Sequence, residues 1–163
     1  MPPSRFISLS GLTFVLVASS PLLPVLARSG QAPDTLPEAS GKAVLIRVCT
    51  TCHDTDLITE APRTVPGWID TVYSMRDFGA EMSEDEFKTV TDYLLVNLAH
   101  LQVNTATAEE MAPVLGVTMG VAEGVVAYRD ARGGFKTIDD LKGVPELDAA
   151  TIDALAPRLL FGN

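Results

Sequence analysis

The sequence predicts an all-α protein, and three observations support this fold class. Apolar residues after Gly41 recur at helical spacing, whereas no stretch shows the sustained alternation of a β-strand. Three capping boxes, each a threonine or serine followed three residues later by an acidic residue, mark the starts of helices. Turns marked by glycine or proline separate the apolar segments. The expected fold is therefore a succession of short helices.

The first 27 residues have the features of an export signal. Arg5 supplies the positive start, an apolar run extends from Phe6 to Val17, and Val25-Leu26-Ala27 offers a cleavage site. No Arg-Arg pair is present, so we expect a Sec-type signal peptide and a periplasmic protein. The alternative is a retained membrane anchor. Two prolines break the apolar segment and it is short for a span, so we expect no stable membrane span after cleavage.

Cleavage would leave a strongly acidic chain that begins with a flexible leader at residues 28–40. The sequence holds 12 basic and 21 acidic residues, and Arg5 would leave with the signal, so 11 basic residues remain. A general nucleic-acid binder needs a net basic face, and this balance argues against that class. It suits a protein outside the cytoplasm whose partner presents a basic patch.

The segment from residue 41 to residue 101 is expected to form three or four helices. Helices are predicted at 41–48, at about 66–77, and from a capping box at Ser83 and Glu86 to a point near His100. Two apolar stripes mark the inner faces of the second and third helices: Trp68, Val72 and Met75, then Phe87, Val90, Leu94 and Leu98.

The strongest chemical signal is Cys49-Thr50-Thr51-Cys52-His53, which holds both cysteines of the chain. Two thiols at this spacing, followed directly by histidine, are typical of c-type haem attachment through two thioethers, with His53 as the proximal iron ligand. A dithiol redox pair is an alternative, but it is expected after a strand, and none is predicted here. A structural disulfide would close almost no loop. One covalent haem c is therefore the expected cofactor.

The second iron ligand is left open by the residues alone. Met75 and Met82 are the methionines available in this half of the chain, and His100 is the only other histidine. Methionines at helical spacing are usually core residues, and a haem site with no second ligand would favour an enzyme or a sensor of small molecules.

Residues 41–99 resemble the small haem c domains found alone or beside periplasmic dehydrogenases. The shared residues include the haem motif, Trp68, Met75, Gly79-Ala80 and Tyr93-Leu94. The resemblance implies a cytochrome c domain over residues 41–101, with Met75 on the iron and Met82 as the alternative. It also implies that Arg63 contacts a haem propionate and that Trp68 contacts the haem edge. A solvated arginine and a core tryptophan are the plain alternatives.

Residues 102–161 resemble the double helix-hairpin-helix module of exported competence DNA receptors, which implies a second domain over residues 102–163. The matching segments are 103–110, Val126-Ala127-Tyr128-Arg129, Gly134-Phe135-Lys136, Asp139-Asp140-Leu141 and Val144-Pro145. DNA-binding versions carry two glycines in each hairpin so that backbone amides approach phosphate.

The two hairpins of this sequence depart from that pattern. The first, Leu115-Gly116-Val117-Thr118, has lost one glycine, and the second, Pro145-Glu146-Leu147-Asp148, has lost both and gained two acids. Residues 102–163 hold nine acidic and five basic side chains. We therefore expect this domain to dock a protein and we expect DNA binding to be weak.

The function expected from these features is single-electron transfer in the periplasm. The chain would carry electrons from a molybdenum or quinone-cofactor dehydrogenase to a terminal oxidase or another cytochrome, with no catalytic residues of its own. The alternatives are a haem-containing surface DNA-binding protein and a haem enzyme or sensor with an open iron site.

Overall fold

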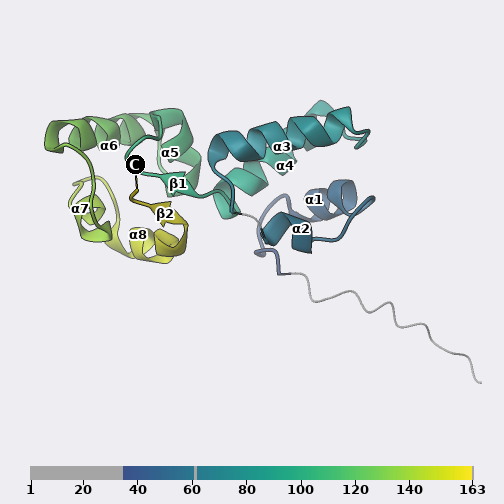
Figure 1. Cartoon of the computed structure of the whole chain (residues 1–163), viewed down its shortest axis with the longest axis horizontal. Coiled ribbons are helices and arrows are strands. Elements are labelled where there is room, and N and C mark those ends of the chain that lie inside the picture. Colours follow the sequence, from purple (N-terminus) through teal and green to yellow (C-terminus); the bar gives the residue numbers. More distant parts are fainter. Residues whose placement is uncertain (1–34, 61, 163) are drawn as a thin grey trace, which may run out of the picture. The chain divides into compact units, whose positions relative to one another are not determined.

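A computed structural model describes residues 35–60 and 62–162 (Figure 1). The chain divides into two units, Met1–Ala32 and Pro33–Asn163, and the described residues all lie in the second. The predicted signal peptide, residues 1–27, lies outside the described residues. The secondary structure consists of α1 (Lys42–Cys49), α2 (Asp56–Thr59), α3 (Val65–Asp77), α4 (Glu84–Asn97), β1 (Leu101–Gln102), α5 (Ala108–Leu115), α6 (Met119–Arg132), α7 (Ile138–Lys142), α8 (Ala149–Leu155), η1 (Ala156–Arg158) and β2 (Leu159–Leu160).

The predominance of helix confirms the predicted fold class in its main feature. The three predicted capping boxes all form, at Ser83 for α4, at Thr107 for α5 and at Thr137 for α7. In each, the cap side chain accepts a hydrogen bond from the backbone N–H three residues on, and the acidic partner accepts one from the cap residue. Local sequence therefore sets where these helices begin.

A short parallel sheet was not predicted. Leu101 pairs with Leu159 and Gln102 with Leu160, and Val103 N–H donates to the Leu160 carbonyl at 3.0 Å. Two residues per strand are too few to give an alternating pattern, and the partners are far apart in sequence. Sequence periodicity had no means of finding this pair.

Asn104 ties the sheet to the loop between α6 and α7. Its Nδ2 donates to the carbonyls of Phe135 (2.8 Å) and Phe161 (3.0 Å), while its Oδ1 accepts from Phe135 N–H (2.7 Å). The loop passes close by, because a Cβ on Gly134 (φ +105°) would lie 3.0 Å from Asn104 Oδ1. One side chain thus fixes the turn that joins the two helix-hairpin-helix motifs.

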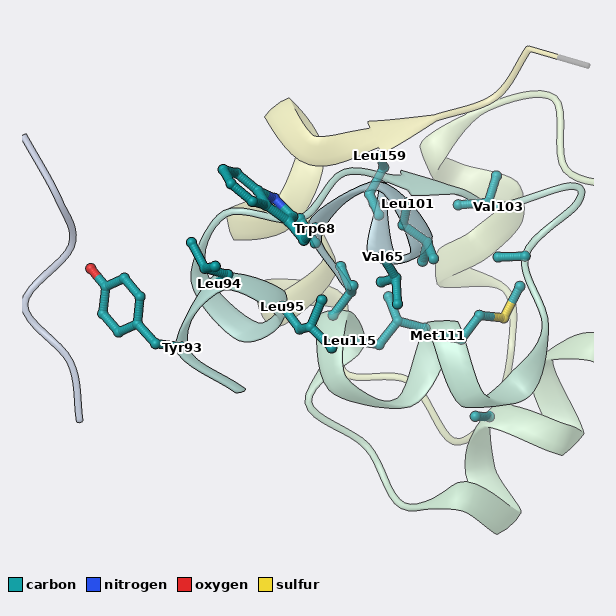
Figure 2. Packing of buried hydrophobic residues seen from close by; sticks show 14 of the residues in the cluster. Val65, Trp68, Tyr93, Leu94, Leu95, Leu101, Val103, Met111, Leu115 and Leu159 are labelled. Atoms are coloured by element: carbon teal, nitrogen blue, oxygen red, sulfur yellow. The ribbon is translucent and has the colours of Figure 1, made fainter. Parts of the chain in front are cut away.

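The buried apolar residues form one continuous cluster, part of which is seen in Figure 2. Val65 and Leu95, from the first half of the segment, belong to the same cluster as Val103, Leu115 and Leu159 from the second half. Hydrogen bonds also link the two halves, because Arg158 Nη1 donates to the carbonyls of Val96 (2.9 Å) and Ala99 (3.4 Å). Buried residues on both sides of residue 102 thus share one core, and the domain boundary predicted there stays a prediction.

Residues 35–40 differ from the flexible leader that was predicted for residues 28–40. Leu36 is buried, the Tyr93 hydroxyl donates to the Pro37 carbonyl at 2.6 Å, and Lys42 Nζ donates to the Leu36 carbonyl at 3.0 Å. Burial of the Leu36 side chain in the core orders this end of the leader. The composition of the leader alone did not indicate this order.

Among the described residues, no single helix is both long and apolar enough to cross a membrane. Helices α5 and α6 pass that test of length and composition only when taken together, and they are bent by 116° at the break between them.

Candidate functional sites

A cavity of about 640 Å³ opens between the end of α1, the α2 segment, and helices α3 and α4. Its size falls in the range of pockets that hold a cofactor, and its wall is mostly apolar. All of the residues predicted to hold the haem line it, together with the alternative ligand: Cys49, Cys52, His53, Arg63, Trp68, Met75 and Met82. The structure brings these residues to one place, and their individual roles stay predictions.

The two cysteines lie at the C-terminal end of α1. Cys49 is the last helical residue, and the hydroxyls of Thr50 and Thr51 donate to the carbonyls of Ile46 and Arg47, so they satisfy the end of the helix. Burial raises the pKa of the Cys49 thiol above its ordinary value. A redox-active dithiol needs a stabilised thiolate, and this environment acts in the opposite direction. The local chemistry therefore disfavours the dithiol alternative.

His53 is oriented by its own neighbour in the chain. Its Nδ1 lies 3.1 Å from the Asp54 carbonyl oxygen. A carbonyl can only accept, so Nδ1 is the donor in this contact, which leaves Nε2 as the ring nitrogen that could bind iron. A neutral imidazole whose other nitrogen is fixed by a backbone carbonyl is the usual form of an iron-binding histidine.

Trp68 supplies the observation that tests whether a haem fits. Its side chain is buried in the cavity wall, and no partner for its Nε1–H is found within the described residues. The Arg63 guanidinium lies 4.9 Å from the centre of its ring. A buried donor of this kind needs an acceptor, and a haem propionate would provide one beside a positive charge. The residues present fit the group.

The structure narrows the possible second iron ligands. Met75, from the face of α3 that also carries Trp68 and Val72, and Met82 both line the large cavity. His100 does not line it. His100 lies instead at a cavity of about 200 Å³ next to Val65, where burial and then the charge of Arg158 lower its pKa.

The first hairpin of the second half joins α5 to α6 through Gly116, which is exposed and has φ +67°. Thr118 replaces the second glycine of the DNA-binding pattern, but its side chain turns back to accept from Val121 N–H and so caps α6. The amides of Met119 and Gly120 in the first turn have no acceptor within the helix. Both residues are exposed, the first turn holds no acidic residue, and a Cβ on Gly120 would meet nothing within 4 Å.

The second hairpin has the opposite character. Asp148 caps α8, and its carboxylate accepts from the Thr151 hydroxyl and N–H, both at 2.7 Å. The hydrogen bond from the Thr151 hydroxyl, and to a lesser extent the one from its N–H, holds the pKa of Asp148 below its ordinary value. The carboxylate is therefore charged at neutral pH. A phosphate would meet this charge at the amides that it needs. The two hairpins are therefore unequal as anion sites.

Comparison with known proteins identifies this half of the chain. A family model described as a helix-hairpin-helix motif matches residues 96–160. Residues 96–160 form a helix-hairpin-helix domain. No solved structure matches the chain.

Three relatives are similar over segments of about this domain's length. Endonuclease/exonuclease/phosphatase family domain-containing protein 1 of Danio rerio is 45% identical over 62 residues, which cover 38% of this chain and 11% of that protein. Its Homo sapiens counterpart is 43% identical over 60 residues, or 37% of this chain and 10% of that protein. ComE operon protein 1 of Bacillus subtilis is 44% identical over 46 residues, or 28% of this chain and 22% of that protein. The chain thus spans a minor part of each relative.

These matches correct the functional prediction. The expected function was a periplasmic cytochrome that passes single electrons from a dehydrogenase and uses the second domain only to dock a protein. The matches are instead to a helix-hairpin-helix motif and to proteins named for an endonuclease/exonuclease/phosphatase family domain and for the ComE operon, and none of the three relatives is named as a cytochrome. The electron-carrier function is therefore wrong as the main conclusion, as is the expectation that a DNA-related interaction is weak.

The prediction failed because it counted charges without placing them. Several of the nine acids are engaged in caps or ion pairs away from the first hairpin: Glu110, Asp130, Asp139, Asp140, Asp148 and Asp153. Thr118 was counted as a lost glycine although it serves as a cap. Met119 and Gly120 were not singled out at all. The available signal was the absence of acidic residues in the turn that follows the hairpin.

Proposed function

We propose that this protein binds nucleic acid through the first hairpin of its helix-hairpin-helix domain and carries one covalent haem c in the cavity of its N-terminal half. The observation that carries the proposal is the first turn of α6, where Met119 and Gly120 are exposed and no acidic residue is present, within a domain of this family. We further propose that the protein is exported, because haem c is attached outside the cytoplasm and the first 27 residues have the pattern of a signal peptide.

Phosphate is the group that the first hairpin would bind. Helix α6 has 14 residues, and its N-terminus presents partial positive charge together with N–H groups that lack helical acceptors. Gly116 and Gly120 place no side chain over these amides, so a phosphodiester can approach them closely. Contacts of this kind carry no base specificity, so binding should be largely independent of sequence. Relatives whose name contains an endonuclease/exonuclease domain agree with a nucleic-acid role.

The haem would be held by Cys49 and Cys52 through thioethers and by His53 Nε2 as the proximal ligand. Met75 is proposed as the second ligand and Met82 as its alternative, while Trp68 Nε1 and Arg63 would contact a propionate. When bound, the group supplies an iron whose oxidation state can change. The apolar wall, with Val72, Val90 and Leu94, would keep water from it.

DNA binding is tested with a pair of matched variants on α6. Gly120→Glu puts a carboxylate beside the first-turn amides, and Gly124→Glu makes the same change one turn further along. Space is open at both positions, and glutamate is the better helix former, so neither variant should lose stability. Fluorescence anisotropy with a short duplex DNA should give a dissociation constant of about 10⁻⁴ to 10⁻⁶ M for the unchanged chain. Gly120→Glu should abolish binding and Gly124→Glu should weaken it only slightly. Equal effects of the two variants, or no binding by the unchanged chain, would remove the proposal.

The haem is tested by extraction. Thioethers survive denaturation, whereas a haem held only by iron ligands does not. Acid-acetone treatment of the exported protein should leave the colour with the polypeptide, and a variant with both Cys49→Ala and Cys52→Ala should release it or fail to acquire it. Complete extraction from the unchanged protein would show that the attachment is wrong.

A further inference from the structure

A third cavity, of about 330 Å³, lies between the C-terminal end of α6 and α7. Tyr128 and Arg132 border it from α6, Lys136 from the joining loop, and Gly143 from the C-terminal end of α7. Nothing in the comparisons assigns a role to it. The cavity lies near the second hairpin, where the Asp148 carboxylate disfavours phosphate. Its basic residues make it a candidate site for an anion.

The basic residues of the domain are unequally engaged. Arg129 pairs with Asp130, Lys142 pairs with Asp139 and Asp153, and Arg158 donates to the carbonyls of Val96 and Ala99. In the described part of the domain, Arg132 and Lys136 are the two basic side chains with no carboxylate within ion-pair distance and no hydrogen bond to a carbonyl. Both border the same cavity and both are exposed.

The carboxylates at this cavity do not cancel these charges directly. Asp140 accepts from the backbone N–H groups of Lys136 and Thr137, at 2.8 and 2.9 Å, and is thereby held in the cap of α7. Asp139 lies 3.6 Å from Lys142 Nζ. Both acids therefore have other partners. Lys136 also attracts Asp140 electrostatically, but no carboxylate of the described residues lies within ion-pair distance of Lys136 or Arg132, so the two cations remain open to a ligand.

Arg132 is positioned before any ligand arrives. Its guanidinium lies 4.1 Å from the centre of the Tyr128 ring, and the Tyr128 ring is stacked at 6.1 Å and 13° on the buried Phe135. A planar guanidinium supported in this way presents a fork that matches phosphate oxygens. Asn104 fixes the loop at Phe135, so it also holds the backbone between Arg132 and Lys136.

We propose that this cavity is a second phosphate site of the domain, in which Arg132 and Lys136 bind a phosphodiester of the nucleic acid whose neighbouring backbone is held at the first hairpin. The site rests on the proposed function, because it names where a second part of the same nucleic acid is bound. This cavity would supply the phosphate contact that the second hairpin cannot make because of the Asp148 carboxylate. Side-chain cations here do what backbone amides do at the first hairpin.

The test compares charge removal here with equal charge removal elsewhere. Arg132→Gln with Lys136→Gln removes two positive charges at the cavity. Arg47→Gln with Lys88→Gln removes two from exposed ion pairs with Glu86 and Asp92 in the N-terminal half. The full chain is titrated with a short duplex DNA at several salt concentrations. The cavity variant should weaken binding about tenfold and reduce the salt slope by about 0.9, the value for one phosphate contact. The control variant should change the affinity by less than about threefold.

A charge-preserving variant serves as a control for loss of structure. Arg132→Lys with Lys136→Arg should retain most of the affinity, since the two charges stay at the cavity. If the cavity variant binds as the control does while Gly120→Glu abolishes binding, the second site is wrong and the proposed function stands. If the unchanged chain does not bind duplex DNA, both are wrong. Displacement of the DNA by inorganic phosphate at low millimolar concentration, lost in the cavity variant, would show a free-phosphate site and overturn the assignment to nucleic acid.

Discussion

Asn104→Ala should destabilise the protein more than any other single polar substitution in the helix-hairpin-helix domain. The change removes three hydrogen bonds of 2.7 to 3.0 Å, two to Phe135 and one to Phe161, and leaves three backbone groups without their partner. A hydrogen bond contributes about 1 kcal/mol net, so the expected loss is about 3 kcal/mol. This is a large fraction of the roughly 5–15 kcal/mol by which domains are stable.

The assay is urea unfolding of the full chain followed by far-ultraviolet circular dichroism. The matched control is Asn97→Ala, because Asn97 makes one hydrogen bond, from Nδ2 to the Tyr93 carbonyl at 2.8 Å within α4. The control should lose about 1 kcal/mol or less. If Asn104→Ala costs no more than Asn97→Ala, the side chain does not hold the loop at Phe135, and the preorganisation argued for Arg132 loses its support.

Three further predictions follow, one on the iron ligand and two on the second hairpin. Met75→Ala should abolish the weak near-infrared band of sulfur–iron ligation in the ferric protein, whereas Met82→Ala should keep it; the reverse result would move the assignment to Met82. Asp148→Asn keeps a capping residue but removes the charge, so DNA binding should strengthen about two- to threefold. The pKa of Asp148 is held below its ordinary 3.8, so its carboxylate adds stability above that pH, and this stability is lost as the pH falls through the lower, folded-state pKa. Acid unfolding curves should lose that component in Asp148→Asn, and unchanged curves would contradict the role of the cap.

Local sequence predicted the helices well, because their boundaries depend on near neighbours. Ser83, Thr107 and Thr137 begin helices where their capping boxes indicated, and the predicted helix at 66–77 is found at Val65–Asp77. The β1–β2 pair was missed because its residues meet only in the folded chain. The order at Leu36 was missed because its place in the core is provided by distant residues such as Tyr93.

The sequence singled out the residues proposed to hold a haem, but it did not single out the surface proposed to bind nucleic acid. The spacing of Cys49, Cys52 and His53 is typical of haem attachment, and a helical period placed Met75 on one face with Trp68. Charge at a surface depends on which acids already have partners, and a sequence count treats Asp140 and Asp148 as free. Tertiary contacts also decide that Arg132 and Lys136 face one cavity. For these reasons the acidic composition gave the wrong conclusion about nucleic acid.

The central claim is that the first hairpin, and not the second, contacts the nucleic-acid backbone. Nuclear magnetic resonance of the isotope-labelled full chain, titrated with a short duplex DNA, reports on each backbone amide separately. We expect the largest shifts at Gly116, Met119 and Gly120, and little change from Leu147 to Ala149, where the Asp148 carboxylate repels phosphate. Shifts concentrated at the second hairpin, or no shifts at either, would contradict the account.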